Sequence, residues 1–104
     1  MMVPNPAPRY VRDASPEGIA FRFVDGSMAR SLAQLVTALQ HASVETAWYH
    51  REHLAPWLRE VLHDEPLARR VEHFARAGLA PDVFRETVLA LARSRLDELT
   101  RVAL

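Results

Sequence analysis

The chain has 104 residues, enough for one domain with one hydrophobic core, and its 49% hydrophobic and 25% charged residues are typical of a globular protein. Thirteen basic residues, all of them arginine, balance thirteen acidic ones, and this neutral charge argues against electrostatic binding to nucleic acid or to an anionic membrane. The absence of cysteine excludes disulfides and thiolate chemistry, and with no 18-residue apolar run and no signal peptide the sequence predicts a soluble cytoplasmic protein.

The first 18 residues differ in composition from the rest of the chain. They carry four of the seven prolines and little periodic apolar content, which is typical of an extended or disordered segment. We therefore expect a disordered, proline-rich leader over residues 1–18, followed by a single helical domain over residues 19–104.

Residues 19–24 alternate between the two faces of an extended chain, with both phenylalanines on one face. Such alternation predicts a β-strand, and the pair Asp25-Gly26 that follows it is a favoured hairpin turn. Residues 27–30 are then expected to form a short second strand or to lead directly into a helix. Because a two-stranded hairpin is marginally stable alone, this one is expected to pack on the helices or to pair with another chain.

Two serines predict the starts of the next two helices. Ser31 is a candidate N-cap, and Gln34 three residues later completes a capping box for a helix that runs to Gln40. Ser43 is the candidate N-cap of a second helix, with Glu45 favourably placed in its first turn. The apolar residues at helical spacing are expected to face inward: Leu32, Leu35, Val36, Leu39, Val44, Ala47 and Trp48.

A third helix is expected to begin near His53 or Leu54. Pro56 then falls in the first turn, where its missing amide hydrogen is not needed for an intrahelical bond. The broad apolar face of this helix consists of Leu54, Trp57, Leu58, Val61 and Leu62. Trp57 is expected to be the largest single residue of the core.

The fourth helix has clear start and stop signals. Asp64 is a good N-cap, and Pro66 suits the opening turn. The helix is expected to run to Ala77, and Gly78 stands where a glycine often follows a helix in a left-handed conformation.

The last helix is predicted from about Pro81 toward Leu104, which is long for a domain of this size. Its apolar residues form two adjacent stripes, Phe84-Val88-Leu91 and Leu89-Ala92-Leu96-Leu99. One stripe suffices to close a monomeric core, so the other is expected to be an apolar interaction site. Together with an unpaired hairpin edge and a neutral charge, this second stripe predicts a two-fold homodimer. The alternative is a monomer in which the hairpin folds back over the second stripe.

These signals together predict a mainly α fold of about five helices with a short N-terminal β-hairpin. The chain resembles a small uncharacterised helical domain of prokaryotic, especially archaeal, proteins in Phe21-x-Phe23-x-Asp25-Gly26, Ser31-Leu32-x-x-Leu35, Tyr49-His50 and the segment from Trp57 to Ala68. The resemblance covers about residues 19–71 and departs from the family at Leu54, where an aromatic residue is expected. It implies one compact unit and no catalytic role.

Three of the five histidines fall within residues 50–63, at spacings that suit a metal site. His-x-x-His presents two imidazoles on one helical face, and Glu-x-x-His occurs in helical carboxylate-bridged metal sites. The candidate transition-metal ligands are therefore His50, His53, Glu60 and His63. Because a bridged site needs two such motifs, a symmetric dimer would supply the second one. The same residues could otherwise form a mononuclear site from His50, His53 and either Glu60 or His63. The alternative is that His50 makes a structural hydrogen bond and that His53 and His63 lie near helix ends.

No motif assigns a catalytic residue or a cofactor, because three glycines leave no phosphate-binding loop and no serine stands in a nucleophile elbow. Arg59, Arg69, Arg70 and Arg76 interleave with acidic residues at salt-bridge spacing, which indicates a solvated ion-pair face and not a nucleic-acid surface. The sequence therefore predicts a non-catalytic protein-interaction or regulatory module. The alternative is a metal-binding protein or metal-dependent enzyme that uses the His/Glu cluster.

Overall fold

The computed structural model describes residues 20–103, and the side chains of residues 20–101. The predicted leader over residues 1–18 lies outside the described residues. The described part contains a two-stranded hairpin and five helices, which confirms the predicted mainly α fold. In chain order the elements are β1 (Phe21–Arg22), β2 (Met28–Ala29), α2 (Leu32–His41), α3 (Val44–Tyr49), α4 (Leu54–Glu60), α5 (Glu65–Ala75) and α6 (Pro81–Ala103).

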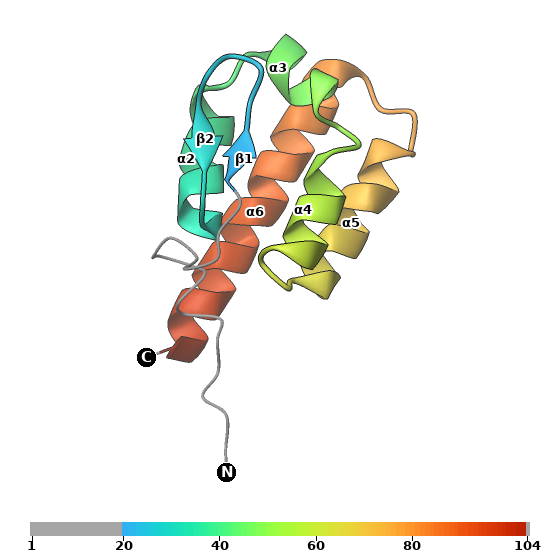
Figure 1. The fold of residues 1–104 in the computed structure, drawn as a ribbon. Coiled ribbons are helices and arrows are strands. Elements are labelled where there is room, and N and C mark those ends of the chain that lie inside the picture. The colour runs from blue at the N-terminus through green and yellow to red at the C-terminus, as the bar shows by residue number, and fades with distance from the viewer. Residues whose placement is uncertain (1–19, 104) are drawn as a thin grey trace.

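Helix α6 is the element on which α2, α3 and α5 pack (Figure 1). The hairpin and α2 lie along one side of it, and α4 and α5 pack together along the other. Helix α3 lies near the N-terminal end of α6, where the Trp48 and Phe84 rings meet edge to face. The most deeply buried side chains of α6 are Phe84, Val88, Leu89 and Ala92. They join residues of the hairpin, α2, α4 and α5 in one core cluster.

The hairpin strands are shorter than predicted, with two residues each, and they pair antiparallel with Phe21 opposite Ala29. As expected from the alternation, Phe21 and Phe23 share the buried face, and their ring centroids lie 4.8 Å apart. Phe21 also meets Trp57 of α4 at a centroid distance of 5.6 Å. Because so short a hairpin is not stable alone, packing of these aromatic rings on the helices holds it in place.

The two predicted serine caps are confirmed. The Oγ of Ser31 accepts a hydrogen bond from the backbone N–H of Gln34 at 3.1 Å, and Ser43 does the same for Thr46 at 3.1 Å. The side chain of Gln34 reaches back to the N–H of Arg30 at 2.8 Å, one residue before the cap. It therefore ties the hairpin to the first turn of α2 instead of completing the predicted capping box.

Helix α4 begins at Leu54, which confirms Pro56 in its first turn, and ends at Glu60. The chain then turns at His63, whose φ of 57° is left-handed. This turn lets the N–H of Asp64 donate to the carbonyl of Leu58 at 2.9 Å. Asp64 then caps α5 as predicted, because its Oδ1 accepts a hydrogen bond from the backbone N–H of Leu67 at 3.2 Å.

Helix α5 ends two residues earlier than predicted. Its last residue is Ala75 and its C-cap is Arg76, where the prediction extended the helix to Ala77. The final turn tightens, because the N–H groups of Arg76 and Ala77 donate to carbonyls only three residues back, at 3.2 and 3.3 Å. Gly78 does adopt a left-handed conformation, with φ of 75°, but it lies two positions beyond the cap.

Both predicted apolar stripes of α6 contact the core of the same chain. Phe84 and Val88 of the first stripe and Leu89 and Ala92 of the second are buried, while Leu91, Leu96 and Leu99 are partly buried against the same cluster. Neither stripe of α6 is therefore left uncovered for self-association. Helix α2 packs on one flank of α6, and α5 packs on the other. Within residues 20–103, no helix is long and apolar enough to cross a membrane.

Two arginines of α6 fix the ends of neighbouring helices. Arg85 donates to the carbonyls of Ala42 and Gln40 at 2.9 Å each, so it satisfies acceptors left open at the end of α2. Arg95 donates to the Oδ2 of Asp64 at 2.9 Å, so it joins the N-cap of α5 to α6. These contacts set the hairpin and α2 on one side of the fold and α4 and α5 on the other.

Candidate functional site

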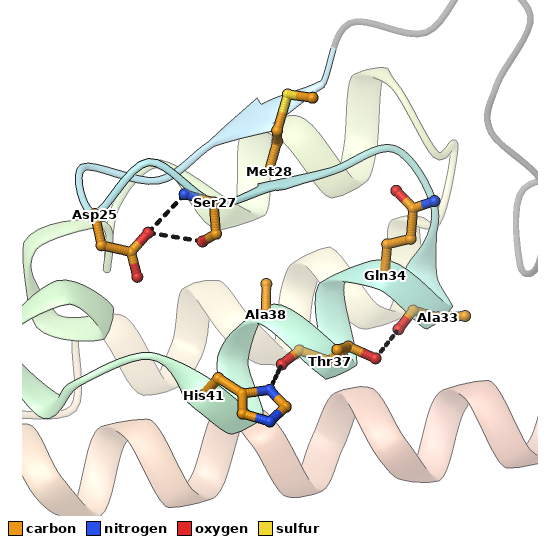
Figure 2. A pocket seen from close by; sticks show the side chains of 8 residues that line it. All are labelled: Asp25, Ser27, Met28, Ala33, Gln34, Thr37, Ala38 and His41. Atoms are coloured by element: carbon orange, nitrogen blue, oxygen red, sulfur yellow. Dashed lines mark hydrogen bonds between the residues drawn. The ribbon is translucent and has the colours of Figure 1, made fainter.

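A groove opens between the second arm of the hairpin and α2, with a volume of about 400 Å³. Figure 2 shows the side chains that line it. The hairpin contributes Asp25, Ser27 and Met28, and α2 contributes Ala33, Gln34, Thr37, Ala38 and His41. The arm and the helix run in opposite directions, so the hairpin loop and His41 lie at one end of the groove and Gln34 lies at the other (Figure 2).

The hairpin loop is held in shape by its own hydrogen bonds. The Oδ1 of Asp25 accepts from the N–H of Ser27 at 2.9 Å and from its hydroxyl at 2.7 Å. These two bonds from Ser27 lower the pKa of Asp25, so the carboxylate stays charged at one end of the groove. Gly26 between them has φ of 96°, which a side chain would strain. This wall of the groove is therefore formed without any ligand.

The other wall is a strip of α2 that carries the small side chains of Ala33, Thr37 and Ala38 and the larger ones of Gln34 and His41. Ala33, Thr37 and His41 follow one another at every fourth residue, which spans about 12 Å of helix. Thr37 donates to the carbonyl of Ala33 at 3.3 Å, and the Nδ1 of His41 lies 2.9 Å from the carbonyl of Thr37. The Thr37 hydroxyl and the Nδ1 of His41 are thus turned toward their own helix.

One large apolar side chain of the hairpin is exposed in the groove. Met28 lines the groove and is 45% exposed, and only three other large apolar residues in the described chain are comparably exposed. Single exposed apolar residues are common on protein surfaces, but this one adjoins the small residues of α2 across a concave surface. This combination favours a surface that another polypeptide covers.

A second unusual feature is a pair of histidines beneath the hairpin. His50 is the C-cap of α3 and is only 5% exposed, and His53 precedes α4. The Nε2 of His50 accepts the backbone N–H of Val24 at 2.9 Å, and its Nδ1 lies 3.0 Å from the Nδ1 of His53. We call these three residues the histidine latch, because they join the hairpin to the turn between α3 and α4.

The hydrogen bonds of the latch define its tautomers. A backbone N–H only donates, so the Nε2 of His50 carries a lone pair and the proton of the neutral ring is on Nδ1. That proton faces the Nδ1 of His53, which must then accept, so the proton of the His53 ring is on Nε2. Both nitrogens of His50 are therefore engaged while the ring is neutral.

The surroundings of His50 are aromatic. Its ring meets those of Phe21, Phe23 and Tyr49 edge to face, at centroid distances of 5.2, 5.3 and 4.8 Å. Burial lowers the pKa of His50 below its ordinary value, and the nearby His53 lowers it further, against a smaller opposing effect from Asp25. The fold therefore favours the neutral ring that the hydrogen bonds require.

The structure brings together two of the four predicted metal ligands. His50 and His53 are in contact, although they lie at helix ends and not on one helical face. Helix α4 ends at Glu60 and His63 lies in the following turn, so Glu-x-x-His does not lie on one helix. Among the described residues, no three His, Asp or Glu side chains are grouped so that they could hold a metal ion.

The predicted ion-pair face is confirmed for three of its four arginines. Arg59 of α4 contacts Glu65 at 2.7 Å and Glu72 at 3.4 Å, while Arg69 of α5 and Arg76, its C-cap, pair with Glu65 and Glu72 respectively. The hydrogen bonds from Arg59 and Arg69 lower the pKa of Glu65. Because these charges are matched and partly exposed, the face offers no concentrated positive field for nucleic acid.

Sequence reasoning missed the groove and the contact between His50 and Val24. One signal could have been used: Ala33 and Thr37 are small residues four positions apart, and they lie outside the set of α2 residues predicted to face inward. The contact of His50 with Val24 spans 26 residues of sequence, and no local pattern encodes it.

Known proteins were compared with the chain in three ways. Neither the protein-family models, nor the curated proteins, nor the solved structures give a match. The resemblance of residues 19–71 to a prokaryotic helical domain stays a prediction. Any function must therefore be argued from the groove and the histidine latch themselves.

Proposed function

We propose that this chain is a non-catalytic interaction module that acts through protein contacts, and that a second copy of the chain occupies the groove. The observation that carries the proposal is the exposed Met28 beside the small side chains of Ala33, Thr37 and Ala38 on α2. Small residues let two backbones approach closely, and a methionine side chain adapts its shape to a partner. The homodimer predicted from the sequence is thus assigned to α2 and the hairpin, and not to α6.

Charge complementarity supports a second copy as the occupant. Asp25 is charged at the loop end of the groove, and the exposed Arg30 lies at the other end, where its N–H bonds to Gln34. In a two-fold arrangement with its axis perpendicular to α2, the α2 helices of the two copies run antiparallel, so the Asp25 end of each meets the Arg30 end of the other. Each surface is then its own complement, as a two-fold interface requires.

We expect a partner to pack its side chains into the groove and not to add a strand to the edge of β2. β2 has only two residues, so a partner strand would gain few main-chain hydrogen bonds from its edge. The α2 strip instead spans about 12 Å, which corresponds to two turns of a facing helix. The groove therefore suits a helix of similar length, such as α2 of a second copy.

Sedimentation and light scattering of wild type and of Thr37→Glu test the proposal. The wild type is expected to be dimeric at roughly 100 μM, since an interface of limited size associates weakly. Thr37 lies near the middle of the strip, so the substitution places two like charges close to the two-fold axis and is expected to yield a monomer. Ala90→Glu adds the same charge at an exposed position of α6 and is expected to leave the dimer intact.

Two results would refute this proposal. A wild-type mass of one chain at that concentration removes the second copy as the occupant. A dimer that Thr37→Glu leaves unchanged places the interface elsewhere. Melting curves of the variants serve as the control, since a helical, exposed position such as Thr37 tolerates glutamate with little change in stability.

A further inference from the structure

Two exposed side chains of the hairpin meet through a sulfur atom. The strand register places Arg22 of β1 directly opposite Met28 of β2, on the other face from the buried Phe21 and Ala29. A guanidinium nitrogen of Arg22 donates a hydrogen bond to the Sδ of Met28 at 3.4 Å. Met28 also lines the groove. A solvent-accessible thioether in contact with a cation therefore stands at the edge of the proposed interface.

Met28 is the side chain of the groove that an oxidant modifies most readily. The chain has no cysteine, and Met28 is the one methionine among the residues that the structure describes. A peroxide converts an exposed thioether to a sulfoxide, which is polar and chiral, and a separate reductase for each epimer reverses the reaction. Because Met28 is exposed and lies outside the core cluster, its oxidation changes the groove and leaves the core intact.

We propose that Met28 is a reversible oxidation site for a peroxide, that Arg22 directs the oxygen to one side of the sulfur, and that the sulfoxide closes the groove to a second copy. The closure of the groove rests on the proposed function. The oxidation and its direction need only one chain, so they can be tested separately.

The oxidation is a two-electron transfer between sulfur and hydrogen peroxide. A lone pair of Sδ attacks one peroxide oxygen, so the S–O bond forms as the O–O bond breaks. The departing hydroxide takes the proton from the oxygen now bound to sulfur and leaves as water. Sulfur is oxidised and the peroxide is reduced. In the reverse reaction a reductase supplies two thiols, which become a disulfide while the sulfoxide oxygen leaves as water.

Arg22 makes the two sides of the sulfur unequal. A thioether sulfur has two lone pairs, and the hydrogen bond from the guanidinium engages one of them. Peroxide therefore reacts more often at the other lone pair, which favours one sulfoxide epimer. Because this contact is exposed and sulfur is a weak acceptor, we expect the two epimers in a ratio of about three to one.

The sulfoxide weakens the packing of a second copy for two reasons. The S–O group is much more polar than a thioether, so a partner that covers Met28 must remove water from it. Its oxygen is also a better acceptor than sulfur, so the Arg22 guanidinium stays beside it and keeps a hydrated charge at the edge of the groove. The dissociation constant of the proposed dimer is therefore expected to rise by about ten-fold.

Peptide mapping after limited treatment of the folded wild type with hydrogen peroxide measures the direction of oxidation. The peptide that contains Met28 is incubated with the reductase of each epimer, and the two enzymes are expected to reduce unequal fractions. Arg22→Gln, and wild type oxidised in denaturant, should give nearly equal fractions. Arg70→Gln, which removes an exposed arginine of α5, should retain the wild-type ratio. Equal epimers in the folded wild type, or a ratio that Arg22→Gln leaves unchanged, overturns the role of Arg22.

Sedimentation of the oxidised protein measures the closure of the groove. Oxidised wild type is expected to show a dissociation constant about ten-fold higher, which the reductases should reverse. Met28→Leu keeps an apolar side chain of similar size and keeps Met1 and Met2, so it should dimerise equally with and without peroxide. A dimer that full oxidation of Met28 leaves unchanged overturns the closure. A monomeric wild type instead refutes the second copy as the occupant, and unequal epimers in that chain still support directed oxidation.

Discussion

Asp64 offers a quantitative test of how the two sides of the fold are joined. It is 7% exposed, it caps α5 through Oδ1, and its Oδ2 accepts from the Arg95 side chain at 2.9 Å. The cap contributes about 1 kcal/mol, and a hydrogen bond between charged groups contributes about 2 kcal/mol. Asp64→Ala is therefore expected to reduce the free energy of unfolding by about 3 kcal/mol, the sum of the two contributions.

Asp64→Asn separates these contributions. Asparagine is as good an N-cap as aspartate, so this variant should lose only the charged interaction with Arg95, about 2 kcal/mol. The loss stays below the cost of breaking a fully buried pair, because Arg95 keeps Glu98 at 3.0 Å and is partly exposed. For a domain of this size the alanine variant is expected to melt on the order of 15 °C below the wild type.

Denaturant and thermal melts of the two variants provide the measurement. Asp97→Asn, which removes one partner of the exposed Asp97–Arg101 pair on α6, is the matched control and should change stability by about 0.5 kcal/mol or less. The reasoning fails if the melting temperature and the free energy of unfolding of Asp64→Ala equal those of the Asp97→Asn control. It also fails if Asp64→Asn and Asp64→Ala coincide, since the cap would then contribute nothing.

Two further predictions concern the core and a helix end. Trp57→Ala is expected to cost about 3–5 kcal/mol, because a buried indole that packs on the hairpin is removed, whereas the exposed Arg70→Ala should stay within about 0.5 kcal/mol in the same denaturant melts. Gly78→Ala is expected to cost about 1 kcal/mol, although a Cβ there meets no atom within 4 Å, because only its left-handed backbone opposes the change. A Gly78→Ala variant as stable as the wild type would show that this turn rearranges freely.

The local features of the fold were predictable because their causes lie within a few residues. The serine and aspartate caps, the first-turn Pro56 and the hairpin turn each follow from neighbouring residues, and all are confirmed. The end of α5 was misplaced by two residues because its last turn tightens at Arg76, which no residue type signals. The strand lengths were also overestimated. The alternation of side chains runs over residues 19–24, but hydrogen-bonded pairing of the two strands covers only two residues of each.

The candidate site depended on contacts that the sequence does not encode locally. His-x-x-His was read as a helical motif, and the two rings do meet, but across a turn between helices. Glu-x-x-His was also read as helical, but the left-handed residue His63 ends that register. The groove depends on the antiparallel placement of the hairpin arm over α2, which tertiary packing determines.

The hairpin is the element on which the proposed function depends, and physical reasons make it the first part of the fold to open. Its strands contribute few hydrogen bonds, and its burial comes from the rings of Phe21 and Phe23. Helices α2 and α5 share the same apolar core but are also fixed to α6 by the hydrogen bonds of Arg85 and Arg95. Local opening should therefore occur at the hairpin well before global unfolding.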